Sequence, residues 1–317
     1  MIDIIISITD NNVNNLKRTL NSIGDAKGTI IAVVSDAYIN DYNPDEVEQY
    51  CSSSQTIYFM QGKTNSHIGN FYDGLHSRFA SGDIITFLKS GDYFLAAPHL
   101  DRIDRLMQES YNTMVVCGQT QSKLGVSLYH DVKITLQGKF FKRQFIDYYT
   151  FLEDFTNEIE FALNLHYISE VQNKNDMLIY IDEIAVYTDS ALSDIGTACQ
   201  HYFDQILPSQ DFFNNTLAVR YIYHLMCECY FSYIEAINLG LDEETINKLM
   251  KDIYTFFAYF RQLELTDMEE LVLIYNQGIL TRYGLLQHPF VKAIPCIHLI
   301  QFLDMLEEGI QEVLLEE

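Results

Sequence analysis

Positively charged residues are scarce in this chain. It has 20 lysines and arginines against 44 aspartates and glutamates, a formal net charge of −24 over 317 residues. Such a field repels the phosphate backbone of nucleic acids and the head groups of anionic lipids. No stretch combines basic and aromatic residues as nucleic-acid-binding surfaces do. We therefore expect no nucleic-acid partner and interpret the dispersed acidic residues mainly as a solvated surface.

Long apolar runs are also missing, since none reaches the roughly 18 residues that a membrane-spanning helix needs. The sequence begins without a basic leader or a cleavage site, because Met1 leads directly into the apolar run IDIIISI. We predict neither a transmembrane segment nor a signal peptide, and we expect a cytoplasmic protein. With 48% hydrophobic residues, the chain can still build a sizeable core.

Cysteines are few and irregularly spaced in this sequence. The six are Cys51, Cys117, Cys199, Cys227, Cys229 and Cys296. This spacing is typical of buried thiols in a reducing compartment rather than of a disulfide framework. Only Cys227 and Cys229 are close together in the sequence. Residues two positions apart on a helix point in different directions. Core packing is therefore favoured over metal binding for this pair.

Signature motifs of several common enzyme classes are absent. The sequence contains no G-x-x-x-x-G-K-[ST], no G-x-G-x-x-G after the first apolar run, no G-x-S-x-G and no H-E-x-x-H. These motifs place phosphates, dinucleotides, a nucleophilic serine or a zinc ion. Kinase, dehydrogenase, serine hydrolase and zinc peptidase activities are therefore not supported.

The first 95 residues alternate short β-branched runs with helical patterns. Strands are predicted at IDIIISI, TIIAVVSDA, TIYFMQG and DIITFLKSGDYF. Helices are predicted over NNVNNLKRTLNSI, which Gly24 ends, and over IGNFYDGLHSRFA, with a loop around Asn43-Pro44-Asp45. This order predicts an α/β fold with a mostly parallel sheet and flanking helices. Ligands of such sheets bind beyond the carboxyl ends of the strands, so residues 7–10, 35–37 and 89–93 are predicted to form one site.

Helical patterns replace the strand-like runs from about residue 200 onward. Helices are predicted over residues 216–239, 243–264 and 297–315. Asp242 is the expected N-cap of the second, and Thr266-Asp267-Met268-Glu269 has the form of a capping box that opens another helix. We place a boundary near Leu207-Pro208, which predicts an α/β domain over 1–205 and an all-helical C-terminal region over 206–317.

A series of fragments, in order, resembles segments of the family 2 glycosyltransferases, which have the GT-A fold. The family's SIIIPTYN, LERTLxSI and IIVVDDGS correspond to DIIISITDN, LKRTLNSI and IIAVVSDAY. Its N-x-G loop with ARN-x-G and its AxGDYIxFLDSDD correspond to MQGKTNSHIGNFYDGL and ASGDIITFLKSGDYF. Further on, GKFFKRQFI, TNEIEFALNL and YIDEIAVY occupy the order of GKLFxR, a GED-type acidic motif and a strand ending in Tyr. The resemblance covers residues 1 to about 190 and implies a nucleotide-sugar-binding domain of the GT-A type.

The resemblance implies roles for individual residues. In the family an Asp after the second strand reads the base, and Asp36 holds that position although Ser35 replaces the preceding Asp. The family's Arg before Asn is Gly69 here, and Lys63 is a candidate replacement for its charge. The candidate nucleotide-sugar-binding residues are Ser7, Thr9, Asp36, Lys63, Asn70, Lys89 and Asp92.

The acidic motif of the family, D-S-D-D, is altered to Lys89-Ser90-Gly91-Asp92. In the family this motif holds ribose and a divalent cation that neutralises the leaving diphosphate. Three interpretations are open. Asp92 alone anchors Mg²⁺ or Mn²⁺ whose other ligands are phosphate oxygens and water, the Lys89 ammonium replaces part of the cation's charge, or the metal site is lost.

An inverting sugar transfer needs a carboxylate base, which the family draws from its GED-type motif. Alignment of TNEIEFALNL on that motif places Asn157 and Glu158 at the paired acidic positions, so Glu158 is the candidate catalytic base. The alternative for Glu158 is an exposed residue favoured at a helix N-terminus. Glu153 and Glu160 are poorer candidates, and His201 is a weaker candidate for a metal ligand, because a lone histidine is more often structural.

These residues predict a glycosyltransferase that moves a hexose from a nucleotide-diphosphate sugar, with UDP as the expected nucleotide. The acceptor would be a hydroxyl group of a glycan, a glycolipid or a protein, in polysaccharide or glycoprotein synthesis. The alternative is a catalytically inactive protein of the same fold that serves as a binding or scaffolding partner of an active transferase. The altered charged positions favour this alternative, and the retained ones favour the enzyme. The helical half is expected to dock an acceptor or a second subunit, as a homodimer or with a partner transferase.

Overall fold

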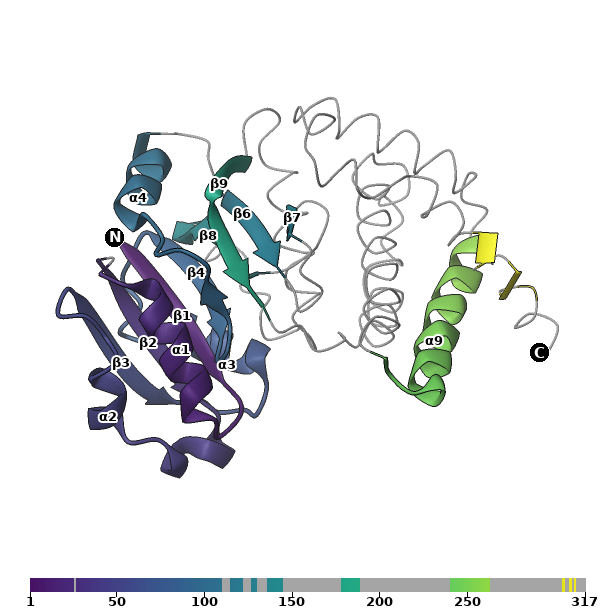
Figure 1. Cartoon of the computed structure of the whole chain (residues 1–317), viewed down its shortest axis with the longest axis horizontal. Coiled ribbons are helices and arrows are strands. Elements are labelled where there is room, and N and C mark those ends of the chain that lie inside the picture. Colours follow the sequence, from purple (N-terminus) through teal and green to yellow (C-terminus); the bar gives the residue numbers. More distant parts are fainter. Residues whose placement is uncertain are drawn as a thin grey trace. The chain divides into compact units, whose positions relative to one another are not determined.

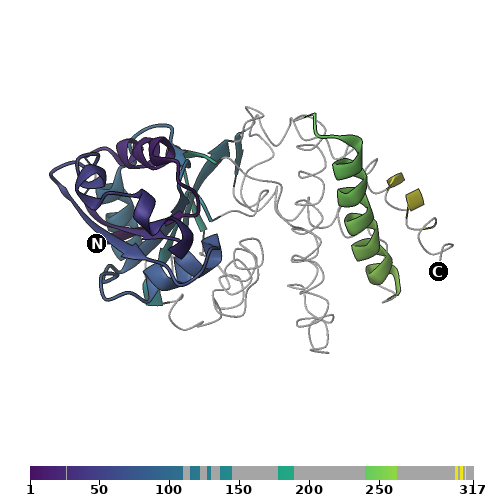
Figure 2. The same cartoon turned by 90° about the horizontal axis from the view of Figure 1, so that it is seen from below.

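The computed structural model describes residues 1–25, 27–109, 115–121, 127–129, 136–144, 178–188, 240–262, 304, 305, 308, 309 and 311 (Figures 1 and 2). The chain divides into two compact units, Met1–Ala191 and Leu192–Glu317. The boundary predicted between residues 205 and 206 lies outside the described residues, as do the helices predicted over 216–239 and from Thr266. No helix in the described part of the chain is both long and apolar enough to cross a membrane.

Among the described residues, nine strands form one sheet with the order β3-β2-β1-β4-β8-β6-β9-β5, and β7 pairs with β6. The first four strands in this order are parallel to one another and correspond to the four predicted strands. They are β1 (Ile2–Ile8), β2 (Gly28–Val34), β3 (Gln55–Gln61) and β4 (Ile84–Lys89). The others are β5 (Tyr93–Phe94), β6 (Val115–Gln121), β7 (Ser127–Tyr129), β8 (Lys139–Lys142) and β9 (Leu178–Tyr187). The predicted mostly parallel sheet with flanking helices is thus confirmed.

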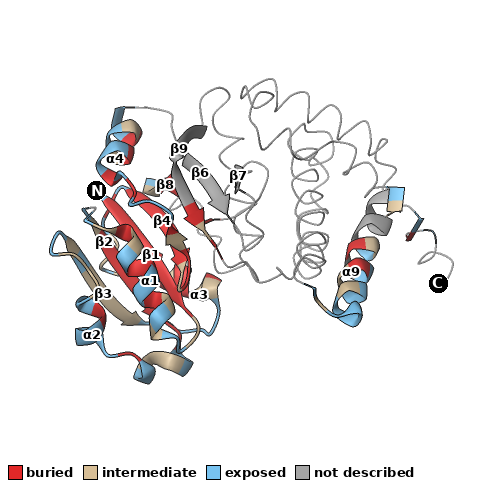
Figure 3. Cartoon of the chain, viewed as in Figure 1, coloured by how far each residue is buried: buried red, intermediate tan, exposed pale blue. Residues whose placement is uncertain are grey.

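Strand β1 lies at the buried centre of this sheet. All seven of its residues are buried, whereas the residues of β3 are intermediate or exposed (Figure 3). A strand covered by helices on both faces needs apolar side chains at successive positions rather than at alternate ones. The run IDIIISI meets that need with five isoleucines, and Asp3 and Ser7 are its two polar residues.

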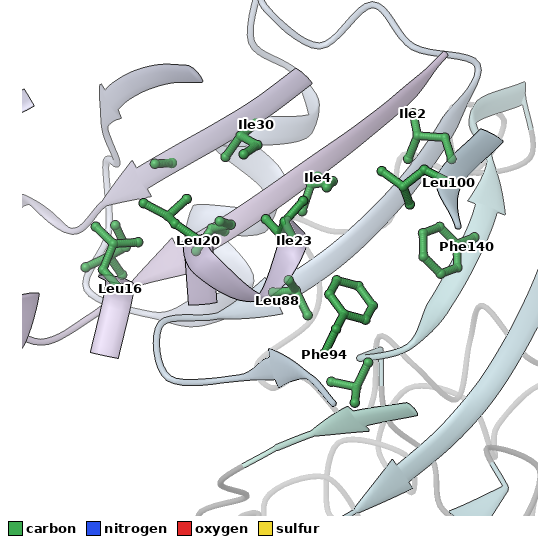
Figure 4. Packing of buried hydrophobic residues seen from close by; sticks show 14 of the residues in the cluster. Ile2, Ile4, Leu16, Leu20, Ile23, Ile30, Leu88, Phe94, Leu100 and Phe140 are labelled. Atoms are coloured by element: carbon green, nitrogen blue, oxygen red, sulfur yellow. The ribbon is translucent and has the colours of Figure 1, made fainter. Parts of the chain in front are cut away.

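One face of the sheet is covered by helices α1 (Val13–Ile23) and α4 (Leu100–Glu109), and α2 (Pro44–Glu48) adds Val47 to the same core. The even-numbered isoleucines of β1 point to this face. Figure 4 shows their packing against side chains of α1 and α4. Among the labelled residues are Ile2, Ile4, Leu16, Leu20, Ile23, Leu88, Phe94 and Leu100. The amphipathic helix predicted to end at Gly24 is confirmed as α1. Gly24 follows the last helical residue and has a φ of 65°, which glycine adopts readily.

The odd-numbered side chains of β1 face helix α3 (His67–Leu75). This helix approaches the sheet closely through Gly74, where an added Cβ would lie 2.6 Å from Cγ2 of Ile5. One turn away, the ring of Phe71 contacts that of Phe87 edge to face at 5.1 Å. A glycine at the contact therefore brings the polar N-terminal turn of α3 within hydrogen-bonding distance of β1.

The amino end of β1 carries a buried ion pair on the same face. Asp3 is 0% exposed and its Oδ2 accepts from the Gly82 N–H at 2.7 Å and from Nη2 of Arg143 at 3.0 Å. Burial nevertheless raises the pKa of Asp3 above its ordinary value, and the bonds from Gly82 and Arg143 only partly offset that effect. This pair joins the amino end of β1 to the residue after β8.

Two local predictions were wrong. The segment Asn43-Pro44-Asp45 does not form a loop but starts α2, because Asn43 caps the helix by accepting from the Asp45 N–H at 3.1 Å and Pro44 suits the first helical turn. Helix α3 ends at Leu75, five residues before the predicted end at residue 80. The Ser77 hydroxyl accepts from the Phe79 N–H at 3.3 Å and thereby competes with helical backbone bonds.

In the second unit, helix α9 (Glu243–Gln262) confirms the helix predicted over 243–264. Its predicted N-cap is also confirmed, because Oδ1 of Asp242 accepts from the Thr245 N–H at 2.8 Å. That bond lowers the pKa of Asp242. The described residues within 297–315 are helical as well.

Replacing Gly74 by alanine tests the close packing of α3 on β1. We expect Gly74→Ala to lower the free energy of unfolding by about 1 to 3 kcal/mol, because overpacking outweighs the higher helix propensity of alanine. Urea unfolding followed by circular dichroism measures the change. In an Ile5→Ala background, which removes the nearer of two crowded methyl groups and leaves Cγ2 of Val33 at 3.0 Å, the same substitution should cost clearly less. An equal loss in both backgrounds would contradict the proposed contact.

Candidate active site

The carboxyl ends of β1 and β4 meet where the strand order reverses direction. From β1 the chain steps to β2 and β3 on one side, and β4 then pairs on the other side of β1. Open α/β sheets bind ligands at such a switch point. Backbone bonds join the neighbouring ends, from Ser35 N–H to Ile8 O at 2.9 Å and from Ser90 N–H to Ser7 O at 2.8 Å. The three predicted segments therefore lie together at one edge.

The side chain of Asn70 joins the strand ends at this edge by hydrogen bonds. It is 0% exposed in α3, and its Nδ2 lies within hydrogen-bonding distance of four acceptors on β1, β2 and the residue that follows β2. They are Ser7 Oγ at 3.1 Å, Ile8 O at 3.3 Å, Val33 O at 3.3 Å and Ser35 Oγ at 3.0 Å. An amide nitrogen has two hydrogens, so these acceptors share them. In this structure Asn70 positions the strands, and nucleotide contact by Asn70 stays a prediction.

His67 is a residue of this site that sequence reasoning missed. Its Nδ1 lies 2.9 Å from Ser7 Oγ and its Nε2 lies 3.2 Å from Thr9 Oγ1. Because the Ser7 oxygen accepts from Asn70, its own proton can go to Nδ1, and Nε2–H then donates to Thr9. The available signal was that His67 starts α3 directly after the N-cap Ser66 and lies one turn before Asn70. The imidazole thus orients the half-buried hydroxyl of Thr9.

Asp36 and Lys63 lie on the loops after β2 and β3. Asp36 is exposed at the start of the 3₁₀ helix η1 (Asp36–Asp41), and Nε2 of Gln61 donates to its Oδ1. Lys63 contacts Asp73 twice, through its backbone N–H at 2.6 Å and through Nζ at 3.5 Å. The Lys63 side chain is 82% exposed and that of Asp73 is 5% exposed, so solvent screens this ion pair from the lysine side. Asp36 therefore presents its carboxylate to solvent, while Lys63 is engaged with α3.

The segment Lys89-Ser90-Gly91-Asp92, aligned above with an acidic motif, forms a tight turn between β4 and β5. Asp92 is 1% exposed, and its Oδ2 accepts from the Lys89 N–H at 2.8 Å. Gly91 has a φ of 105°, a conformation that side-chain-bearing residues rarely adopt. Helix α1 holds the turn, because Thr19 Oγ1 accepts from the Gly91 N–H and Arg18 Nη2 donates to the Gly91 carbonyl, both at 2.9 Å. The carboxylate of Asp92 is thus directed into its own turn.

Lys89 shares a face of the sheet with Ser7. The two residues are register partners in the parallel pair of β1 and β4, and partners in a parallel pair point to the same side. Lys89 is half-buried, at the last position of β4. A cation-bearing side chain therefore starts at the switch point, beside the hydroxyl that His67 contacts.

These side chains do not fit a divalent cation as they are arranged. Asp92 is buried with one oxygen bound to a backbone N–H, and the residue three positions before it is a lysine, whose charge opposes the binding of a cation. No group of three or more His, Cys, Asp or Glu residues that could hold a metal occurs in the described ranges. A metal at Asp92 stays a prediction that requires a rearranged turn. Glu158, with Glu153, Asn157, Glu160 and His201, lies outside the described residues, so its role as base stays a prediction.

Comparison with known proteins identifies the fold. No protein-family model and no curated protein matches this chain. Residues 1–349 of TarS from S. aureus, solved in complex with UDP-GlcNAc, match with a TM-score of 0.59 and 14% identity over 92% of each chain. The corresponding complex with UDP has a TM-score of 0.59 and 14% identity, and the match covers 86% of this chain and 82% of that one. At such identity the likeness shows the fold alone, which is GT-A-like.

A longer TarS structure matches with a TM-score of 0.56 and 13% identity. The match covers 85% of this chain and 50% of the TarS chain. This chain therefore spans about half the length of that protein.

Removing the Asn70 amide tests its role as the clamp between β1 and β2. We expect Asn70→Ala to lower the free energy of unfolding by about 2 to 4 kcal/mol, because buried hydroxyl and carbonyl groups lose their donor. Urea unfolding measures the loss. The control is Asn14→Ala, an exposed position of α1, which should change stability by less than about 0.5 kcal/mol. Equal effects at both positions would show that the clamp adds nothing.

Proposed function

We propose that this chain binds a UDP-linked sugar at the carboxyl edge of β1, β2 and β4 and transfers the hexose to an acceptor hydroxyl group. The observation that carries the proposal is the collection of Thr9, Asp36 and Lys89 at the switch point of a GT-A-like sheet. TarS, which shares this fold, has been solved with UDP and with UDP-GlcNAc. The shared fold and the polar edge support a nucleotide-sugar donor.

The exposed carboxylate of Asp36 suits recognition of the base, because a carboxylate accepts the ring N–H of uracil. Its bond from Gln61 limits the directions in which it can point. The Thr9 hydroxyl, oriented by His67, is a second group for the nucleoside or the first phosphate. These two residues follow neighbouring strands, so the nucleotide would lie across the ends of β1 and β2.

In the transfer, the acceptor oxygen attacks the anomeric carbon while the bond from that carbon to the diphosphate oxygen breaks. The bonding electron pair leaves with UDP, and the acceptor proton goes to a carboxylate, for which Glu158 is our candidate. A glycan, a glycolipid or a protein side chain supplies the hydroxyl group. The second unit, which contains α9, is our candidate for docking the acceptor or a second subunit.

One observation favours the second candidate function, a catalytically inactive scaffold of the same fold. The carboxylate that survives from the family's acidic motif, Asp92, is buried in its own turn. A protein that has lost transfer activity could keep the nucleotide site as a structural element. Turnover distinguishes this scaffold from the enzyme.

Nucleotide binding is tested by thermal unfolding with UDP, GDP, CDP and dTDP. We expect UDP to raise the melting temperature most, because a ligand at a hundred times its Kd adds about 2.7 kcal/mol to the stability of the folded state. Asp36→Ala should remove the preference for UDP. Its control, Asp25→Ala, makes the same charge change at an exposed position before β2 and should preserve that preference. If none of the four nucleotides shifts the transition, the proposal fails.

Turnover is tested by UDP release from UDP-GlcNAc and UDP-glucose, with and without added acceptors. We expect Glu158→Gln to reduce release by about 100-fold or more while UDP affinity is retained, because the amide cannot take the acceptor proton. Release by wild type supports the enzyme. Nucleotide binding without any release supports the scaffold.

A further inference from the structure

The charge of the donor diphosphate needs a partner in this site. Resting on the proposed function, we propose that the site binds its donor without a divalent cation and that the Lys89 ammonium group takes the cation's place beside the diphosphate. The inference concerns the same site, and it is carried by the geometry of the turn between β4 and β5 rather than by nucleotide recognition.

The turn directs its two charged residues differently. Its carboxylate is withdrawn, since Asp92 is 1% exposed and accepts a hydrogen bond from the backbone of the same turn at 2.8 Å. Drawing Asp92 out to a metal ion would break that bond and expose a turn that α1 holds through Thr19 and Arg18. The described conformation therefore withdraws the metal ligand and keeps the lysine at the edge.

Lys89 is placed for this role by the sheet. Its backbone is fixed on one side by pairing with β1 and on the other by the bond to Asp92. Its side chain leaves the sheet on the face of Ser7 and Thr9, whose hydroxyl groups His67 contacts. A lysine on a fixed backbone at the end of a parallel strand is a preorganised cation for a phosphate.

The charge of the whole protein makes a local cation necessary. With a net charge of −24, the surface repels a diphosphate until it reaches a positive group. Lys63 lies on the loop after β3, where it contacts the buried carboxylate of Asp73. Lys89 lies at the switch point by position, because it ends β4 in register with Ser7 of β1.

During transfer, negative charge grows on the diphosphate as its bond to the anomeric carbon breaks. An ammonium group stabilises that charge by hydrogen bonding and by its field, and it keeps its proton throughout. The electron pair still leaves with UDP, and the acceptor proton still goes to the carboxylate base. Lys89 thus stabilises the leaving diphosphate electrostatically and neither gives nor takes a proton.

Calorimetric titration of the full chain with UDP and with uridine, in EDTA and in excess Mn²⁺, tests the inference. We expect UDP to bind wild type with affinities within about twofold in the two conditions, and Lys89→Met to weaken UDP binding by about tenfold or more. Uridine, which lacks the diphosphate, should bind Lys89→Met and wild type equally, which also shows that the variant is folded. Lys89→Arg, which keeps the charge, should retain UDP binding in EDTA.

Two controls separate charge from position. Lys27→Met makes the same change at an exposed residue before the amino end of β2 and should leave UDP affinity unchanged. Asp92→Asn keeps an oxygen that can accept from the Lys89 N–H but removes the carboxylate that a metal ion would need, so its UDP affinities in EDTA and in Mn²⁺ should still lie within about twofold of each other.

Binding of UDP that requires Mn²⁺ and is lost in Asp92→Asn would overturn the inference while sustaining the proposed function. Retention of full UDP affinity in Lys89→Met would also overturn it. If neither UDP nor uridine binds wild type in either condition, the proposed function fails as well, and the two failures are thereby distinguished.

Discussion

The buried amide of Asn70 is the contact on which the architecture of the site depends. It joins the carboxyl ends of β1 and β2 through Ser7 and Ser35. The Ser7 hydroxyl in turn is hydrogen-bonded to His67, which also contacts Thr9. The amide reaches the strands because Gly74 allows α3 to lie close to β1. Gly62 leaves room on the other side, since an added Cβ there would lie within van der Waals radii of Asn70 Oδ1. The polar edge is therefore a consequence of close helix-to-sheet packing.

Polar residues at the two ends of β1 serve different purposes on the same face of the sheet. At the amino end, Asp3 is held by Arg143 and Gly82 in a closed, buried arrangement that joins β1 to the residue after β8. At the carboxyl end, the Ser7 hydroxyl is hydrogen-bonded to His67 and to the buried Asn70, and Thr9, which His67 also contacts, is half-buried. A charge is tolerated at the amino end because it is paired, whereas the carboxyl end carries uncharged hydroxyl groups.

The geometry of the turn Lys89-Ser90-Gly91-Asp92 decides where its two charged residues are placed. Glycine at position 91 permits a backbone conformation that an aspartate would strain, and Asp92 closes the turn instead of facing outward. The lysine at position 89 then remains at the edge of the sheet. In a chain with a net charge of −24, a lysine at the switch point offers a positive charge to an anionic ligand, as the proposed binding without a metal ion requires.

The sequence by itself determined the parallel core strands, helix α1 with its terminal Gly24, and α9 with its Asp242 cap, because each depends on periodicity or on a contact within a few residues. It also pointed to the three segments of the candidate site, because ligands of open α/β sheets bind beyond the carboxyl ends of the strands. The start of α2 and the end of α3 depend on local contacts, of Asn43 with Asp45 and of Ser77 with Phe79, that the sequence interpretation missed. Tertiary structure alone decided that His67 meets Ser7 and Thr9 and that Asp92 is buried. These two features arise between residues about 60 positions apart or from burial. No local pattern encodes them, because which side chains meet is set by strand order and by how closely a helix packs on the sheet.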